Sequence, residues 1–166
     1  MRRFFVALWA LALTVAAFGQ PDRTSLVTRV YLDASQILHI VEQNGKEVVP
    51  PKEKDQVAFS SPAIALDHKT VGWLVDVPNC CTSYPIAVTL VVYRSGKIIR
   101  RLGNEFMIAG WGFRAGGTQV AFYTNTVHGD LAPRYELHDV KTGRLVASWE
   151  GHLTEASPSW TAGLPE

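Results

Sequence analysis

Three short glycine turns constrain the fold of this chain more strongly than any other feature. They are Asn44-Gly45-Lys46, Ser95-Gly96-Lys97 and Thr142-Gly143-Arg144, and each separates two runs rich in β-branched and aromatic residues. Glycine supplies the positive φ that tight hairpin turns require, so each turn predicts a β-hairpin. The glycines lie 51 and then 47 residues apart, and a spacing of this size indicates an internal repeat.

Two longer segments support the repeat, because each reads as strand, turn and strand ahead of its hairpin. They are residues 63–76 and 110–125. Apolar residues alternate at equivalent places in the two segments, as a strand with one buried face requires, at Val71, Trp73, Val120 and Phe122. We therefore predict a single all-β domain over residues 20–150. It is an antiparallel meander of four-stranded units, of which the first copy is incomplete.

The pattern of these units resembles the blades of TolB-type and WD40-like β-propellers. The resemblance covers residues 56–150 and rests on a short turn before an apolar strand, followed by a hairpin such as YELHDVKTGR at residues 135–144. A closed propeller needs about four or more blades, whereas this chain has length for about three. The resemblance therefore implies an open partial propeller, a ring completed by several chains, or two packed sheets. Of these we favour an open meander that folds into two packed sheets.

The first twenty residues differ in character from the rest. Arg2 and Arg3 precede an uncharged apolar run from Phe4 to Phe18, and the small residues Ala17 and Gly19 lie at −3 and −1 from the expected cleavage site. This order is typical of a secretory signal peptide, and the run is shorter than the roughly 20 residues of a membrane span. We predict a signal peptide at residues 1–19, cleavage between Gly19 and Gln20, and a periplasmic or secreted protein with no later membrane contact. The alternatives are an uncleaved anchor and a strand of the core.

The net charge of the chain gives no reason to expect a charged partner. The full sequence has 16 basic and 15 acidic residues, and loss of Arg2 and Arg3 leaves 14 against 15. A nearly neutral domain lacks the electrostatic attraction that nucleic acids or anionic membranes need. We therefore expect a protein or a small ligand as partner, and no nucleic acid.

The only two cysteines, Cys80 and Cys81, are adjacent in the loop 77–85. Free thiols seldom persist in an oxidising compartment. Neighbouring Cα atoms are about 3.8 Å apart, however, and disulfides prefer roughly 4.4 to 6.8 Å. We predict a strained vicinal disulfide. Buried reduced thiols, intermolecular bonds and a redox role remain open, whereas adjacent cysteines lack the spacing of zinc ligands, so we expect no metal site.

The equivalent loop of the third unit, residues 124–133, carries His128 and Asp130 around a glycine. Such a pair could transfer a proton or bind a metal, but it could also form a self-contained turn, which we favour. If the two units stack as neighbours, both loops lie on one rim. That rim would hold Cys80, Cys81, Tyr84, His128 and Asp130.

Residues 151–166 show no strand pattern and are predicted to form a flexible C-terminal tail. Trp160 within it either docks on the domain or remains exposed. Trp111 and Phe113 alternate on one predicted strand, and we assign them to the core rather than to a sugar-stacking platform.

Together these features predict an exported binding or interaction module that uses the loops 77–85 and 124–133. The candidate binding residues are Tyr84, His128 and Asp130. The sequence lacks the motifs of serine hydrolases, zinc proteases and phosphate-binding loops, so we predict no catalytic residue and no cofactor. Two alternatives stay open: a thiol-redox or hydrolytic enzyme built on both cysteines and His128, and a subunit of an oligomeric propeller-like assembly.

Overall fold

The computed structural model describes residues 25–103, 106–128 and 131–164. In these residues the chain forms three antiparallel sheets, and within each sheet the strands pair in their order along the chain. The first sheet consists of β1 (Val27–Leu32), β2 (Leu38–Glu42) and β3 (Glu47–Val48). The second consists of β4 (Ala58–Ile64), β5 (Thr70–Val77), β6 (Ile86–Arg94) and β7 (Lys97–Leu102). The third consists of β8 (Met107–Arg114), β9 (Gln119–Asn125), β10 (Arg134–Asp139) and β11 (Leu145–Glu150). Two short 3-10 turns, η1 (Ala115–Gly117) and η2 (Ser159–Thr161), complete the described elements.

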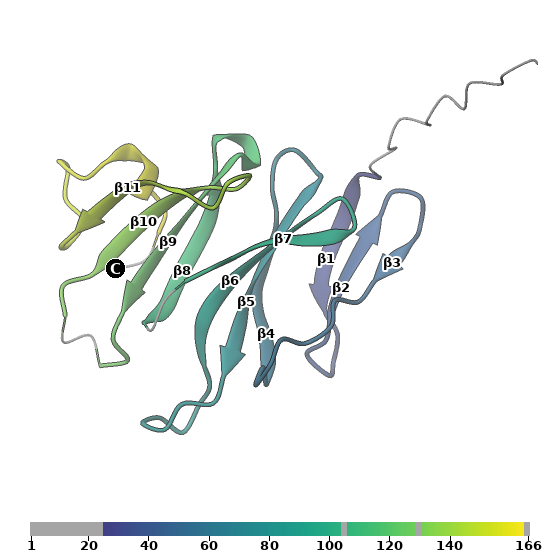
Figure 1. Ribbon diagram of the computed structural model, residues 1–166, viewed down its shortest axis with the longest axis horizontal. Helices are drawn as coiled ribbons and strands as arrows, with labels where there is room; N and C mark the ends of the chain where they lie inside the picture. Colours follow the sequence, from purple (N-terminus) through teal and green to yellow (C-terminus); the bar gives the residue numbers. More distant parts are fainter. Residues whose placement is uncertain (1–24, 104–105, 129–130, 165–166) are drawn as a thin grey trace, which may run out of the picture.

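Each glycine turn closes the last hairpin of one sheet, so one repeat of the sequence is one sheet. The φ angles of Gly45, Gly96 and Gly143 are +84°, +82° and +76°, in the region that favours glycine. Figure 1 shows all three turns toward the upper edge of the molecule. The predicted all-β meander and the incomplete first unit are confirmed, because the first sheet has three strands and the others have four.

The second sheet lies between the other two and buries both of its faces. One face packs against the first sheet, and the other packs against the third sheet. Residues Thr70 to Val75 of β5 are all buried, which requires a partner sheet on each side. The open, all-β antiparallel arrangement is therefore confirmed, but it has three sheets rather than the two packed sheets that we favoured. Among the residues that the structure describes, no sheet closes on itself.

Equivalent residues of the repeat face the preceding sheet in each case. Val71 and Trp73 belong to the core between the first and second sheets. Val120 and Phe122 belong to the core between the second and third sheets. The alternation in the sequence thus predicted which side chains are buried, and the stacking direction determines which sheet they meet.

The aromatic pair of β8 also belongs to a core, as the sequence predicts. Trp111 and Phe113 are partly buried between the second and third sheets. The indole N–H of Trp111 donates to the carbonyl of Ser61, 3.1 Å away. Gly72 of β5 makes room for this ring, because a Cβ at position 72 would lie 2.5 Å from it.

The outer edges of the sheets are irregular. Each of the edge strands β1, β4, β7, β8 and β11 carries one extra residue relative to its partner at one point of the pairing. The remaining edge strand, β3, has only two residues. Bulges of this kind disrupt the row of free backbone groups that would otherwise accept another strand. The described edges are therefore poor templates for strand addition.

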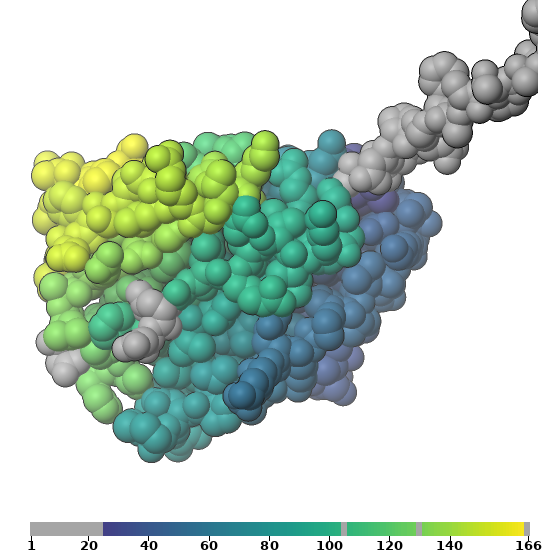
Figure 2. Space-filling model, in the orientation of Figure 1, coloured from purple at the N-terminus to yellow at the C-terminus, as the bar shows by residue number. Residues whose placement is uncertain are grey.

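The C-terminal segment lies against the outer face of the third sheet. Leu164 is buried there with Tyr123, Tyr135 and Leu137, and Trp160 packs partly buried against the same cluster. Figure 2 shows this segment, in yellow, lying against the third sheet. Of the two alternatives for Trp160, the docked one is correct. The flexibility predicted for the tail as a whole stays a prediction.

The predicted signal peptide at residues 1–19 lies outside the described residues, as does its cleavage site. Within the part of the chain that the structure describes, no helix has the length and apolar character to cross a membrane. Export therefore stays a prediction from the sequence.

Candidate functional site

The two cysteines lie in the connection between β5 and β6, and both are exposed. They are unbonded in this structure, with their Sγ atoms 2.8 Å apart. The hydrogen bond with Cys80 raises the pKa of the Cys81 thiol, so Cys81 is less readily ionised than an isolated cysteine. The predicted disulfide stays a prediction. The raised pKa weighs against Cys81 as the nucleophile of a hydrolytic enzyme, because such a nucleophile is a thiolate.

A short chain of hydrogen bonds spans the cysteine pair. The Asn79 side-chain amide donates to Oγ1 of Thr82 at 3.2 Å, and the Thr82 hydroxyl donates to the carbonyl of Tyr84 at 2.6 Å. These bonds fold the loop into a compact turn. Tyr84 remains 56% exposed, so it is available to a partner.

Two cavities adjoin each other beside this loop and share Pro78. The larger has a volume of about 670 Å³, and the smaller has a volume of about 240 Å³. We call them together the β5–β6 groove. The larger part is lined by Glu53, Lys54, Asp55, Val75, Val77, Pro78, Val88, Thr89 and Arg101. The smaller part is lined by Val57, Pro78, Asn79, Thr82, Ser83, Tyr84 and Pro85.

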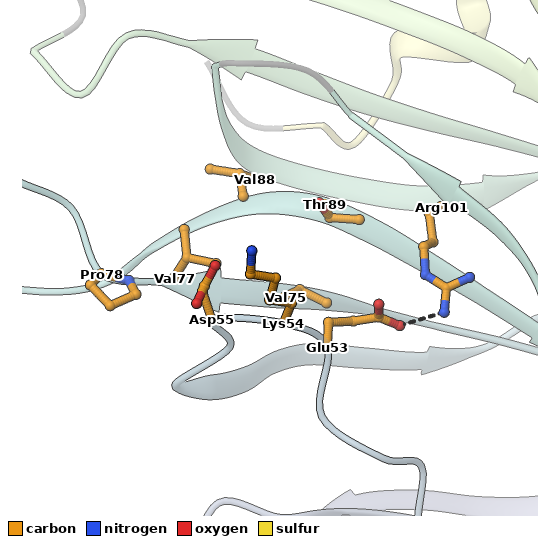
Figure 3. A pocket seen from close by; sticks show the side chains of 9 residues that line it. All are labelled: Glu53, Lys54, Asp55, Val75, Val77, Pro78, Val88, Thr89 and Arg101. Carbon is orange, nitrogen blue, oxygen red and sulfur yellow. Dashed lines mark hydrogen bonds and ion pairs between the residues drawn. The ribbon is translucent and has the colours of Figure 1, made fainter.

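The floor of the β5–β6 groove is apolar because valines of β5 and β6 form it. Val88 lies where the β5–β6 register shifts, since Val75 pairs with Thr89 while Asp76 pairs with Ala87. Bulges of this kind turn a side chain away from the regular alternation. Figure 3 shows Val75, Val77 and Val88 on β5 and β6, beside the charged side chains that also line the cavity.

Charged residues of both signs line the rim of the β5–β6 groove. Arg101 contacts Glu53 at 2.7 Å across it, and this hydrogen bond raises the pKa of Arg101. Lys54 and Asp55 follow on the same wall, as Figure 3 shows. The four charges cancel, so the groove favours neither anions nor cations.

The groove wall is held in place by Gln56, which is 8% exposed. Its side-chain carbonyl accepts from the backbone N–H of Glu53 at 2.8 Å, and its amide donates to the carbonyl of Ala58 at 2.9 Å. A buried polar side chain with both ends bonded fixes the local backbone. The segment that carries the rim residues Glu53, Lys54 and Asp55 is therefore held in place by Gln56, a residue that the sequence analysis did not identify.

The second candidate loop lies apart from the groove. Figure 1 shows the β5–β6 and β9–β10 connections at the same lower edge, in line with the predicted common rim. His128 is exposed and lines none of the described cavities, and Asp130 lies outside the described residues. Other residues of the loop 124–133, among them Thr124 and Leu131, line a separate cavity of about 180 Å³. Of the three candidate binding residues, only Tyr84 lines the β5–β6 groove.

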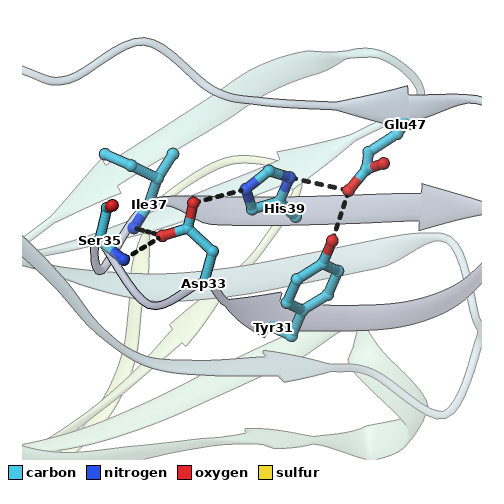
Figure 4. A network of polar contacts seen from close by, with 6 residues as sticks. All are labelled: Tyr31, Asp33, Ser35, Ile37, His39 and Glu47. Atoms are coloured by element: carbon cyan, nitrogen blue, oxygen red, sulfur yellow. Dashed lines mark hydrogen bonds and ion pairs between the residues drawn. The ribbon is translucent and has the colours of Figure 1, made fainter.

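A polar cluster that the sequence analysis missed covers the outer face of the first sheet, as Figure 4 shows. His39 lies between two carboxylates, with Nε2 3.3 Å from Asp33 and Nδ1 2.7 Å from Glu47. The contact between Nδ1 and Glu47 is short enough for an ion pair, but its angle does not fit a hydrogen bond. The Tyr31 hydroxyl donates to Glu47 at 2.7 Å, and the Tyr31 ring stacks on His39.

The carboxylates of this cluster are held in their ionised form. The backbone N–H of Ile37 and the ring of His39 lower the pKa of Asp33. The Tyr31 hydroxyl lowers the pKa of Glu47, and the same hydrogen bond raises the pKa of Tyr31. Residues two apart on β1 and β2 share a face, so strand alternation was the signal that could have grouped these side chains.

A second histidine–carboxylate pair lies on β10. His138 Nε2 is 2.8 Å from Glu136, and Nδ1 lies 3.1 Å from the carbonyl of Gly143. The hydrogen bond with His138 lowers the pKa of Glu136. Burial opposes protonation of His138, but the bonds to Glu136 and Gly143 outweigh it and raise the pKa of His138. Both side chains are largely buried, so the pair stabilises the sheet rather than serving a ligand.

Two further observations define the functional problem. In the described residues, no group of three or more histidine, cysteine, aspartate or glutamate side chains is arranged to hold a metal ion. No protein family matches the sequence, and no curated protein matches it. The β5–β6 groove is therefore the feature on which a function can be based.

Proposed function

We propose that this protein is a binding module that holds an extended, mostly apolar segment of a partner protein in the β5–β6 groove. One observation carries the proposal: two adjoining cavities share Pro78 and run from the valines of β5 and β6 to the exposed ring of Tyr84. Of the two loops predicted to bind, the loop 77–85 is the one that lines this groove.

The chemistry of the groove favours a protein segment over a charged small molecule. Its valine floor can accept apolar side chains, each of which contributes roughly 1.5 to 3 kcal/mol when it leaves water. The rim carries balanced charges, as the polar rim of a protein interface does. An exposed tyrosine next to an apolar depression is the type of residue that dominates binding energy in such interfaces.

We further propose that the three sheets are propeller-type blades of the TolB or WD40-like kind, and that the protein acts after export to the periplasm or the medium. The support for blades is the equivalence of the three glycine turns and of the buried strand residues. The support for export is the basic and apolar start of the sequence. Detection of the intact N-terminus on protein isolated from cells would contradict export by cleavage.

A peptide array tests the groove directly. We expect 12-residue peptides with alternating apolar side chains to bind the purified protein, and titration calorimetry then gives the affinity of the best one. In Tyr84→Ala the affinity should fall by about tenfold or more, equivalent to about 1.4 kcal/mol, because an aromatic contact is lost. The melting temperature should stay unchanged, since Tyr84 is exposed.

Leu66→Ala is the matched control for this experiment. Leu66 is 85% exposed in the turn between β4 and β5 and lines none of the described cavities. Its substitution should leave the affinity within twofold. An array on which no peptide exceeds its scrambled counterpart, or binding equally weakened by Leu66→Ala, would refute the proposed function.

A further inference from the structure

The cysteine pair lies in sequence between two residues that line the smaller cavity of the β5–β6 groove. Asn79 and Thr82 flank Cys80 and Cys81 in sequence, and both line the smaller cavity together with Tyr84. Both thiols are exposed, with the Sγ atoms 2.8 Å apart, so a small oxidant can reach them. A covalent change at the cysteines therefore acts on residues that shape the groove.

We propose that Cys80 and Cys81 form a reversible thiol–disulfide switch that sets the affinity of the β5–β6 groove for its partner. The reduced form, which this structure describes, has the competent wall, and the oxidised form has a distorted one. This inference rests on the proposed function of the groove for its consequence, but not for the thiol chemistry itself.

The exchange needs only a low-molecular-weight disulfide as oxidant. A thiolate of the pair attacks one sulfur of that disulfide, forms a mixed disulfide and releases one small thiolate. The second cysteine sulfur then attacks the first, and the other half of the oxidant leaves as the second small thiolate. In total the pair loses two electrons and two protons, and the oxidant is reduced to two thiols.

Adjacency makes this bond a switch rather than a permanent cross-link. Neighbouring Cα atoms are about 3.8 Å apart, below the roughly 4.4 to 6.8 Å that unstrained disulfides span. Strained and exposed disulfides are the labile ones, since reduction relieves the strain. The ring also closes over a single peptide unit, so it removes little chain entropy from the unfolded state and adds little stability.

Formation of the disulfide between Cys80 and Cys81 changes the backbone of the loop. The backbone between Asn79 and Thr82 has to rotate to bring the two sulfurs into bonding geometry. The 3.2 Å bond from Asn79 to Thr82 spans that backbone, and the Thr82 hydroxyl in turn donates to the backbone carbonyl of Tyr84 at 2.6 Å. A change at the cysteines thus reaches Tyr84 through Thr82.

The decisive experiment compares the protein in oxidised glutathione and in dithiothreitol. Mass spectrometry should show the loss of two hydrogens with no retained glutathione, reversed on reduction. Amide NMR signals of residues 79–84 should shift between the two states, while those of residues 66–69 stay in place. The affinity for the best array peptide should be about tenfold lower in the oxidised protein.

Serine variants separate the switch from the groove. The double variant Cys80→Ser/Cys81→Ser should bind the peptide as the reduced protein does, with no response to oxidant. If no peptide binds at all, the mass and NMR measurements still test the switch, and only the proposed function fails. Covalent dimers, a stable glutathione adduct, or an oxidised protein with unchanged peptide affinity would overturn the proposal.

Discussion

The outer faces of the first and third sheets end the stack in opposite ways. On the first sheet, Tyr31, His39 and Glu47 form a polar cluster that faces water. On the third sheet, Tyr135 and Leu137 are covered by the C-terminal segment. Both faces are the last of their stack, so neither has a neighbouring sheet. An open stack of sheets avoids two exposed apolar faces by making one polar and covering the other.

This difference bears on the alternative of an oligomeric propeller. A ring made of several chains would pack the first sheet of one copy against the third sheet of the next. Propeller blades meet through apolar faces, whereas here one face is polar and the other is occupied. Assembly of this kind would require the C-terminal segment to leave its place, and it stays a prediction that light scattering can test.

Removal of residues 152–166 should have the largest effect. It uncovers the apolar face of the third sheet and removes the packed side chains of Trp160 and Leu164. We expect a loss of about 3–5 kcal/mol in unfolding free energy by urea titration, the range for loss of a large buried side chain. Light scattering should show association through the uncovered face. If the truncated protein has an unchanged urea midpoint and stays monomeric, the segment does not contribute to stability or prevent association.

Arg114→Met tests how the covering segment is held. Arg114 at the end of β8 donates to the carbonyls of Trp160 and Ala162, at 2.6 and 2.8 Å, and its burial lowers its pKa. Methionine keeps the apolar stem but none of the N–H groups, so we expect a loss of about 1.5–3 kcal/mol. Arg144→Met in an exposed turn is the control and should change stability by less than about 0.5 kcal/mol. Equal effects of the two variants would contradict the tether.

The two histidine–carboxylate clusters sharpen the comparison, because one is buried and the other faces water. The pKa of His138 is raised above its ordinary 6.5. The stabilisation that its charge gives the fold is therefore fully present below pH 6.5 and is lost as the pH rises through the pKa of His138 in the folded protein. The pKa of Glu136 is lowered below 4.5. The stabilisation that its charge gives the fold is therefore fully present above pH 4.5 and is lost as the pH falls through the pKa of Glu136 in the folded protein. The pair should therefore stabilise the fold most strongly between these two limits.

His138→Gln should cost about 1–2 kcal/mol within that window and less at alkaline pH. Urea unfolding of wild type and variant at several pH values measures the difference. A loss that is constant across the whole range would mean that the stacking of His138 on Phe122, rather than its charge, carries the effect.

Glu47→Gln on the first sheet should have the smallest effect. Glu47 accepts from Tyr31 and contacts His39, but the cluster is in water and its charges are screened. We expect a slight loss of stability, smaller than that of Arg114→Met, which disappears in about 1 M salt. Tyr31→Phe removes the other end of the same hydrogen bond and should match it. A loss equal to that of His138→Gln would mean that the outer cluster is as important as the buried pair.

Much of the fold could be predicted, while less of the site could. The glycine turns locate the hairpins, because positive φ is a local requirement that Gly45, Gly96 and Gly143 meet without help from the rest of the chain. The number of sheets was missed, although the unbroken apolar run of β5 was the signal for a strand covered on both sides. For the site, Tyr84 was identified from its loop, whereas Glu53 and Arg101 come together from positions 48 residues apart. No local pattern links them.

The sequence by itself determined the strands, the turns between them and the side chains that turn inward, since these depend on residues close together in the chain. It also set the cysteines side by side. Only the tertiary structure decided that three sheets stack with one polar and one covered end, and that the loop 77–85 meets the segment 53–57 to form a groove. The physical reason is that a sheet face can be covered by any apolar surface of the right shape. Which surface covers it depends on how all the faces are buried together.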